Sequence, residues 1–248
     1  MNEFEGTLIE LSEKESLPLL KGGEIVSGKR IPWGSNYTVL VQIGAGEGKY
    51  IRAIYKPRDG ERPLYDFPTG TLYKREYAAF LLARTLGWPN VPLTVVREGP
   101  YGVGSAQLHV EGDPQLTYFE IAEKYREEFL KFSVFDVIAN NADRKGGHCL
   151  VGEDGRIWSI DHGLTFHDVF KMRTVMLEYW GQPIPQALVA DMEKLSACLA
   201  SQSDLLEGMK EMLFRQEIDA VSRRLERLLK TKHVPKLDPN RNVPWPLV

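Results

Sequence analysis

The sequence predicts an α+β fold with two lobes, a strand-rich lobe over residues 1–110 and a helix-rich lobe over residues 111–248. Runs rich in β-branched residues, interrupted by glycine and proline, fill the first part of the chain and are typical of short strands. Apolar residues recur at helical spacing over most of the second part. The pattern changes at Glu111–Asp113, a polar stretch with a central glycine, which predicts the boundary between the lobes there.

The strands expected in the first lobe end at residues that favour turns. Tyr37–Ile43 leads into Gly44–Gly48, whose glycines are typical of a hairpin turn, and Tyr50–Lys56 stops at a proline. Two further strands are expected at Val91–Val96 and Ser105–Val110. Together these segments predict a sheet whose connections are mostly hairpins.

A helix is expected within the first lobe, over Leu72–Leu86. Its aromatic residues Tyr73, Tyr77 and Phe80 fall at helical spacing, and Gly87 is placed to end it.

The second lobe is expected to begin with a buried amphipathic helix over residues 119–138, because apolar residues lie on one side of it and charges on the other. Two short strands follow, at 149–151 and 157–160, joined by a tight turn. Residues 185–232 are helical in pattern, and the proline-rich tail from residue 234 is expected to run extended along the surface.

Composition excludes several classes of function. Thirty-four acidic and thirty-one basic residues give a net charge of −3, so no broad attraction to nucleic acid or to an anionic membrane is expected. Cys149 and Cys198 lie too far apart in sequence to indicate a metal-ligand pair or a disulfide framework. No apolar run approaches the ~20 residues that span a bilayer, and the N-terminus lacks the pattern of a signal peptide. We therefore expect a cytoplasmic protein without integral membrane association.

Lys56 is the first candidate for chemistry, because it ends a strand with apolar neighbours. Such a lysine would point its ammonium into a cleft and would need an acidic partner, since an unpaired buried charge is costly. Glu76 lies inside the expected helix and could reach back to it. Taken alone the pair is a weak signal, and a purely structural ion pair is the alternative interpretation.

The second candidate is the loop Asn140–His148, which directly follows the expected buried helix. Asp143 could accept a hydrogen bond from an incoming hydroxyl group, with Arg144 beside it, so both are candidate catalytic residues. His148 would offer a nitrogen ligand to a metal ion. The alternative is an Asp143–Arg144 pair that braces the loop, with His148 satisfied locally.

The third candidate is Asp161, at the end of a short strand and two residues before Gly163. One hairpin separates it from Asp143, so the two carboxylates are expected at the same mouth of a cleft. Phosphoryl transfer needs a cation on the phosphates, acidic or polar ligands for magnesium, and a carboxylate near the attacking hydroxyl group. Lys56, Asp143 and Asp161 supply these three in chain order.

The loop Asn140–His148, followed after a short hairpin by Ile160–Gly163, resembles the catalytic and metal loops of the phosphatidylinositol 3- and 4-kinase superfamily. With Ile54–Pro57 and Asp66–Tyr73, the chain is still more similar to a group of short bacterial kinase-like proteins of unknown substrate. The resemblance extends from about residue 23 to residue 185.

The resemblance implies a two-lobed protein-kinase-like fold that binds ATP between its lobes. It implies transfer of the γ-phosphoryl group to a hydroxyl of an unidentified lipid, protein or small molecule, with Mg²⁺ or Mn²⁺ bound by Asp161 and His148. In this comparison Asp143 is the catalytic aspartate. The implied nucleotide contacts are Lys56, Glu76, the turn residues Ser35 and Asn36, and Gln107, His109 and Val110 beside the adenine.

His148 departs from the family pattern, because the lipid kinases carry asparagine there. An imidazole nitrogen suits manganese or zinc better than magnesium, so the preferred metal and the activity stay open. A nucleotide-binding pseudokinase that acts as a regulator and an enzyme that transfers AMP are therefore alternatives. A metallohydrolase built on His148, Asp161, His162 and His167 is a weaker one, since the sequence shows no His-x-x-x-His helix.

Overall fold

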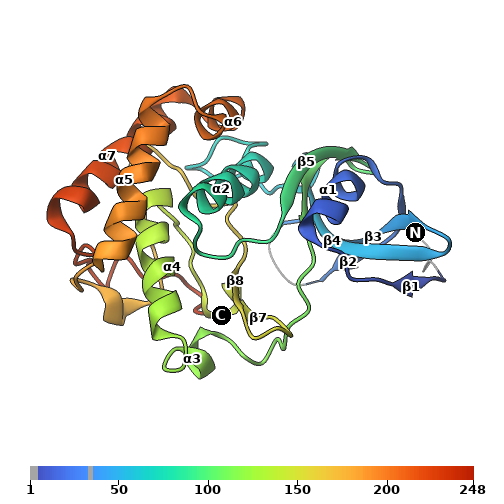
Figure 1. Ribbon diagram of the computed structural model, residues 1–248, viewed down its shortest axis with the longest axis horizontal. Coiled ribbons are helices and arrows are strands. Elements are labelled where there is room, and N and C mark those ends of the chain that lie inside the picture. The colour runs from blue at the N-terminus through green and yellow to red at the C-terminus, as the bar shows by residue number, and fades with distance from the viewer. Residues whose placement is uncertain (1–4, 33–35) are drawn as a thin grey trace. The chain divides into compact units, whose positions relative to one another are not determined.

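The computed structural model describes residues 5–32 and 36–248, and it has the α+β architecture that the sequence predicts (Figure 1). The chain divides into two compact units, the first made of Met1–Tyr77 and Pro92–Val110 and the second of Ala78–Val91 and Glu111–Val248. The sequence analysis expected a single break near residue 110. In the structure most of the helix before that point belongs with the second unit instead.

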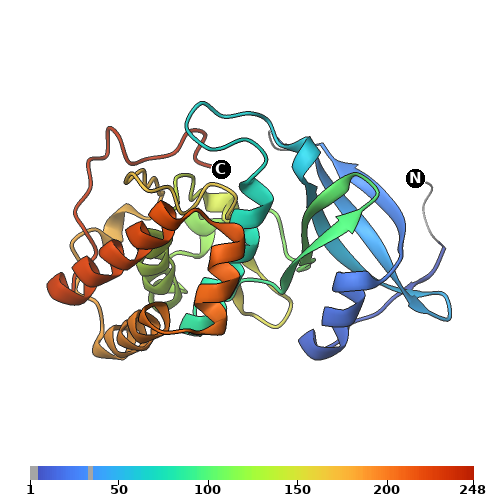
Figure 2. The same ribbon diagram turned by 90° about the horizontal axis from the view of Figure 1, so that it is seen from above.

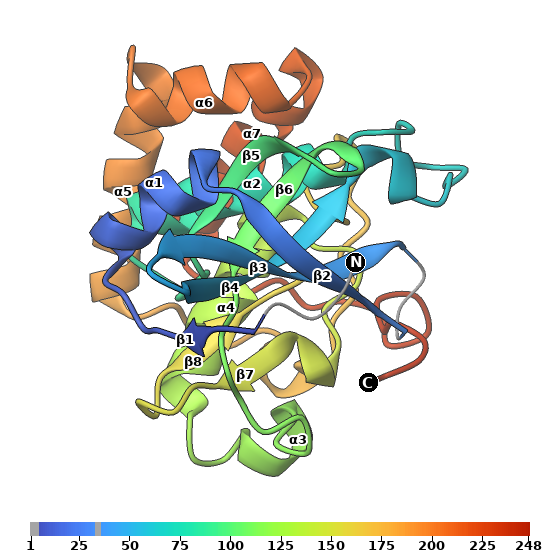
Figure 3. The same cartoon turned by 90° about the vertical axis from the view of Figure 1, so that its right-hand side faces the viewer.

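The first unit contains a six-stranded sheet with the order β2-β3-β4-β6-β5, and β1 pairs with β4 in parallel (Figure 3). Its strands are β1 (Thr7–Leu8), β2 (Ile25–Ile31), β3 (Thr38–Gly46), β4 (Lys49–Pro57), β5 (Thr94–Gly99) and β6 (Gly102–Leu108). The expected strands before and after the first hairpin are confirmed as β3 and β4. Alternate residues of both strands are buried, as expected for a sheet with one packed face.

Helix α1 (Glu13–Gly22) packs against β3, β5 and β6, and the sequence analysis did not predict it. Ser12 and Glu15 form a capping box at its start, in which each side chain binds the other residue's backbone amide. Arg97 fixes its far end by donating from both terminal nitrogens to the carbonyls of Leu20 and Gly23, at 3.0 and 2.8 Å. The helix thereby covers part of the sheet.

The second unit contains most of α2 (Leu72–Leu86), whose bounds agree with the sequence prediction. The remaining elements of the unit are α3 (Tyr118–Ile121), α4 (Arg126–Ala139), β7 (Cys149–Val151), β8 (Ile157–Ser159), α5 (Gln186–Ala200), α6 (Asp204–Met212) and α7 (Arg215–Thr231). Helix α7 packs against α4, α5 and α6 (Figures 1 and 2). Strands β7 and β8 form the expected hairpin.

The single helix expected over residues 119–138 is wrong, because two helices occupy that stretch. The break falls before Arg126, where Tyr125 has φ −118° and ψ 34°, outside the helical region. Every residue of α4 from Phe132 to Ala139 is buried, so its C-terminal half is a central core helix rather than an amphipathic one. Its buried residues include Asp136, which anchors the loop that follows.

None of the helices within residues 5–32 and 36–248 combines the length and the apolar character needed to cross a membrane.

Candidate active site

Lys56 and Glu76 form an ion pair in the first unit. Lys56 lies on β4, between β3 and β6, and its Nζ is 2.5 Å from Oε1 of Glu76 on α2. The Glu76 side chain is only 4% exposed and that of Lys56 23%, so both charges are largely removed from water. A pair in such a setting costs much more to break than a surface pair. The lysine ammonium is thus held in a fixed position at the end of a central strand.

Gly104 controls how closely β6 approaches Lys56. A Cβ atom at this position would lie 2.4 Å from the Lys56 carbonyl oxygen and 2.7 Å from Cα of Pro57. Both are backbone atoms, so they cannot move aside as a side chain can. The absence of a side chain at residue 104 therefore permits the strand spacing beside the lysine.

The predicted nucleotide-binding turn lies partly outside the described residues, because Ser35 is not among them. Asn36 accepts a hydrogen bond at Oδ1 from the amide of Arg62, 2.9 Å away, and Tyr37 donates its amide to the carbonyl of Gly60 at 2.8 Å. These bonds attach the start of β3 to the loop that follows Lys56.

The segment predicted to contact adenine lies at the end of β6. Gln107 is buried and donates from Nε2 to Oγ1 of Thr94 at 2.9 Å, so its side chain takes part in the sheet. The His109 amide donates to the Arg52 carbonyl at 3.0 Å, and Val110 is half-buried at the last position of the first unit.

In the second unit, a fully buried arginine organises the loop between α4 and β7. Arg144 donates from Nε and Nη2 to the two carboxylate oxygens of Asp136, at 2.8 and 2.9 Å, and neither side chain is exposed. Nη1 donates to the carbonyls of His148 and Ile160, at 3.1 and 3.2 Å, and Nη2 also reaches Oγ of Ser159 at 2.8 Å. One guanidinium therefore joins the loop to the end of β8. This planar, forked pattern of donors is particular to arginine.

Two asparagines end α4 and begin the loop. Asn140 has φ 54°, a left-handed conformation common where helices end, and its amide group donates to the carbonyls of His167 and Val169, each at 2.8 Å. Asn141 donates to Asp136 at 2.9 Å and accepts from the amide of Asp143 at 3.0 Å. The sequence analysis missed this positioning role, although consecutive asparagines after a long apolar helix are a usable signal for a helix end.

Asp143, His148 and Asp161 come together at the end of this network. Nε2 of His148 lies 3.5 Å from Oδ2 of Asp161, and Ile160 donates its amide to the His148 carbonyl at 3.1 Å. The Asp161 side chain is 49% exposed, and its φ of 58° lies in the left-handed region, which is uncommon for a residue other than glycine. Asp161 thus combines an accessible carboxylate with an unusual backbone conformation.

Burial is the main cause that raises the pKa of Asp143 to about 6. The positive charge of Lys145, whose Nζ is 3.6 Å from Oδ2 of Asp143, opposes the rise, and the negative charge of Asp161 adds to it. The two carboxylates are therefore close enough to repel each other. A divalent cation beside them would relieve that repulsion.

The chemistry of the donors Asp161 and His148 fits a divalent cation. Asp161 offers carboxylate oxygens and His148 an imidazole nitrogen, a combination that suits manganese or zinc better than magnesium. Within the described ranges, no group of three or more His, Cys, Asp or Glu residues could hold a metal. Two protein donors agree with sites in which water and substrate phosphates complete the coordination shell.

His162 does not join this group, since its side chain is fully buried, with Nε2 2.9 Å from Oγ of Ser159. His167 packs beside Asp168, with Nδ1 3.0 Å from Oδ1. The set of residues that suggested a metallohydrolase is therefore not brought together as a group of ligands in the part of the chain that the structure describes.

The tail beyond α7 returns to this loop. Asn242 donates from Nδ2 to the Met172 carbonyl at 2.7 Å and accepts at its own carbonyl from the Thr174 amide at 2.9 Å. The Gly146 amide donates to the Leu247 carbonyl at 2.8 Å. The sequence analysis expected an extended surface tail and did not predict that it supports the loop carrying Asp143.

A family model for phosphatidylinositol 3- and 4-kinase matches residues 86–217 of the chain. Protein Rv2133c of Mycobacterium tuberculosis (strain ATCC 25618 / H37Rv) is 36% identical over 92% of this chain and 94% of its own length. Phosphatidylinositol 4-kinase gamma 4 of Oryza sativa subsp. japonica is 27% identical over 60% of this chain, which corresponds to 32% of that protein.

Solved structures show the same fold at low sequence identity. The Helicobacter pylori proinflammatory kinase CtkA is 12% identical with a TM-score of 0.55, covering 87% of this chain and 94% of that one. Hydra Fam20, solved with sugar, is 14% identical with a TM-score of 0.55, covering 93% and 92%. The Golgi casein kinase with Mn/ADP bound is 15% identical with a TM-score of 0.54, covering 93% and 77%. The fold is therefore kinase-like.

Proposed function

Because the chain belongs to the phosphatidylinositol 3- and 4-kinase family, we propose that it is an ATP-dependent phosphotransferase that moves the γ-phosphoryl group to a hydroxyl group. The observation that carries this proposal is the grouping of Asp143, His148 and Asp161 around a buried arginine network. Asp143 feels the charge of Asp161, and Asp161 lies 3.5 Å from His148. A general base beside a metal-binding carboxylate is what phosphoryl transfer requires of a protein.

Each unit supplies a part of the proposed machinery. Lys56, held by Glu76, would contact the phosphates of ATP as a point charge. Asp161 and His148 would hold a divalent cation, which when bound would neutralise charge on the phosphate oxygens. The first unit would thus bind the nucleotide, while the loop residues of the second would perform the chemistry.

Asp143 would act on the acceptor. The acceptor oxygen forms a bond to the γ-phosphorus, the bond from that phosphorus to the β,γ-bridging oxygen breaks, and ADP leaves with the electron pair. The hydroxyl proton passes to the Asp143 carboxylate. A carboxylate with a pKa of about 6 is a stronger base than an ordinary aspartate and is still mostly ionised at neutral pH, as general-base catalysis needs.

Arg144 would have a positioning role rather than direct contact with the reactants. Its guanidinium is fully buried and bonded to Asp136, His148, Ile160 and Ser159. It would therefore serve the reaction by fixing where Asp143 and Asp161 lie. Precise placement of reacting groups accounts for a large share of enzymatic rate enhancement.

The test is a thermal-shift titration with ATP, run with Mg²⁺ and separately with Mn²⁺. A ligand that binds only the folded state adds ~2.7 kcal/mol of stability at ~100-fold excess over its dissociation constant. We expect a shift that needs nucleotide and metal together and that Asp161→Asn removes. The matched control is Asp154→Asn, in an exposed turn, which should keep the shift. No shift at saturating ATP would refute the proposal.

A nucleotide-binding pseudokinase is the second candidate, and His148 is the observation that favours it. Its Nε2 lies 3.5 Å from Oδ2 of Asp161, at a position where the resemblance to the lipid kinases implies asparagine. The variant His148→Asn distinguishes a pseudokinase from an active phosphotransferase. If the parent binds ATP without turning it over and His148→Asn gains turnover, the protein is a regulator. If both turn over ATP, the mass of the modified acceptor distinguishes a transferred phosphoryl group from AMP.

A further inference from the structure

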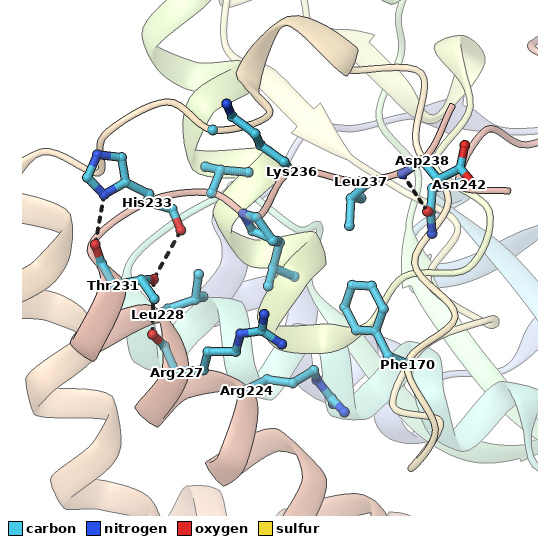
Figure 4. Close-up of a pocket in the computed structure, with 14 residues that line it drawn as sticks. Phe170, Arg224, Arg227, Leu228, Thr231, His233, Lys236, Leu237, Asp238 and Asn242 are labelled. Atoms are coloured by element: carbon cyan, nitrogen blue, oxygen red, sulfur yellow. Dashed lines mark hydrogen bonds between the residues drawn. The ribbon is translucent and has the colours of Figure 1, made fainter. Parts of the chain in front are cut away.

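A pocket of ≈ 580 Å³ lies in the second unit, between α7, the C-terminal part of α4, the segment around Phe170 and the tail after α7 (Figure 4). Asp143, His148 and Asp161 are not among the residues that line it. It is therefore a separate cavity from the candidate active site, and it is not part of the proposed phosphotransfer.

Arg224 contributes a buried donor to this pocket. Its Nε donates to the Ile138 carbonyl at 2.9 Å and its Nη1 to the His167 carbonyl at 3.3 Å. Nη2 is buried and makes no hydrogen bond with any described residue. Buried polar groups are nearly always paired, so a buried cationic nitrogen without an acceptor indicates a place for an absent one.

The setting of Arg224 agrees with such an acceptor. Burial is the main cause that lowers the pKa of its guanidinium to about 10, with the charge of Arg223 adding to it and the charges of Asp168 and Glu217 opposing it. A bound anion stabilises the charge of such a poorly solvated arginine more than it stabilises the charge of an exposed one.

A second guanidinium lies on the same face of the helix. Arg227 is three positions after Arg224 on α7, a spacing that brings side chains together, and it is exposed. Figure 4 shows both side chains on the same side of the pocket, while the Lys236 ammonium points away from them. The nearby carboxylate of Asp238 already accepts hydrogen bonds from Asn240.

Apolar side chains form another part of the pocket lining. Phe170, which is 43% exposed, and Leu237 of the tail face the arginines in Figure 4, and Leu228 and Val137 add aliphatic surface. An exposed aromatic ring next to one desolvated and one exposed cation suits a ligand with an anionic head and an apolar body.

We propose that this pocket binds a phosphate monoester attached to an aromatic or aliphatic group. Nη2 of Arg224 and the guanidinium of Arg227 can donate together to the three terminal oxygens of a phosphate monoester, which carries more negative charge at neutral pH than a carboxylate does. The apolar body would lie against Phe170 and Leu237.

The same arginine connects the pocket to the candidate active site. Ile138 lies in the last turn of α4, directly before the loop with Asp143, and the His167 carbonyl that Arg224 binds also accepts from Asn140. A ligand that fixes Arg224 should therefore slow hydrogen exchange over residues 164–171, which gives a readout independent of phosphotransfer.

The test uses phenyl phosphate as the probe, with calorimetric titration and thermal shift. Benzoate, benzyl alcohol and inorganic phosphate are the comparison ligands. Arg227→Gln should weaken phenyl phosphate at least tenfold, and Arg215→Gln, the same change on an exposed arginine at the other end of α7, should not. Arg227 is chosen over Arg224 because its side chain is exposed, whereas Arg224 binds the Ile138 and His167 carbonyls, so the Arg227 variant should remain folded.

Lys56→Met separates this site from the nucleotide site. Phenyl phosphate binding that survives Lys56→Met and is lost in Arg227→Gln supports the proposal, as does slower exchange over residues 164–171. Binding lost in Lys56→Met and kept in Arg227→Gln would assign the probe to the nucleotide site and overturn the proposal. Equal binding of benzoate or benzyl alcohol, or no binding at all, would also overturn it. Arg227→Gln should leave ATP binding unchanged, because Arg227 is not part of the proposed nucleotide site.

Discussion

Replacing Asp143 with asparagine removes a charge whose burial lowers the stability of the folded protein. In the absence of divalent ions, burial raises the pKa of this carboxyl from its ordinary value of 3.8 to about 6, so the folded state binds its proton more tightly than the unfolded state does. Between these two values the unfolded protein releases the proton first. Stability should therefore fall as the pH rises through this window and then stay constant above it.

The magnitude follows from the size of the shift. Roughly two pKa units at about 1.4 kcal/mol per unit give an upper limit of about 3 kcal/mol for the cost of the Asp143 charge at neutral pH. The pKa of about 6 already includes the favourable charge of Lys145, and the Asp143 side chain is 30% exposed, so solvent screening reduces the expected gain to about 2 kcal/mol. For a chain of this length that corresponds to about 4–8 °C in melting temperature.

The assay is urea denaturation of the parent and of Asp143→Asn from about pH 4 to about pH 8. The two proteins should be similarly stable at the acid end, with the asparagine variant increasingly the more stable as the pH rises. Asp154→Asn is the control, because hydrogen bonds from Arg156 lower the pKa of that carboxyl. The stability difference between this variant and the parent should therefore change with pH in the opposite direction. A stability difference that does not change with pH would refute the reasoning for Asp143.

Three further predictions concern variants at Arg144, Gly104 and Lys56. Arg144→Met should cost about 3–5 kcal/mol in urea denaturation because it leaves the Asp136 charge buried, and Asp136→Leu in the same protein should recover part of the loss. Gly104→Ala should destabilise the protein by about 1–3 kcal/mol and weaken ATP binding, since its Cβ would collide with the backbone at Lys56. Gly22→Ala, whose Cβ meets nothing within 4 Å, is the matched control and should be neutral or slightly stabilising. Lys56→Met should abolish the ATP-dependent thermal shift, and Arg58→Met, an exposed neighbour, should not.

Local pattern predicted those elements whose sequence and environment agree. β3, β4 and α2 were predicted close to their bounds because alternation and helical spacing match their buried faces. Helix α1 was missed because its apolar residues are few and Pro18 lies inside it, although the capping box that begins at Ser12 was a readable signal. The long helix was predicted without its break because nothing in the spacing of its apolar residues marks the change of backbone conformation at Tyr125.

Spacing along the chain also indicated Asp143 and Asp161, because one short hairpin separates them and a hairpin returns the chain to its starting point. Their support could not be predicted in this way. Asp136 is a charged residue in a predicted amphipathic helix, and the sequence does not indicate that the C-terminal half of this helix is buried on every side. The role of Arg144 follows from that burial, because an arginine beside an aspartate in sequence is compatible with either catalysis or bracing.

The buried arginine explains how two unfavourable features persist side by side. Asp161 holds a left-handed backbone conformation that costs of order 1–3 kcal/mol, and Asp143 holds a charge in a poorly solvated position. Neither would survive in a flexible loop, because each would relax toward solvent. The bonds from Arg144 to the carbonyls of His148 and Ile160 fix the backbone at His148 and directly before Asp161, and Asp136 fixes Arg144 in turn. This core network therefore holds the two carboxylates in an arrangement that is complementary to a phosphate-bound cation.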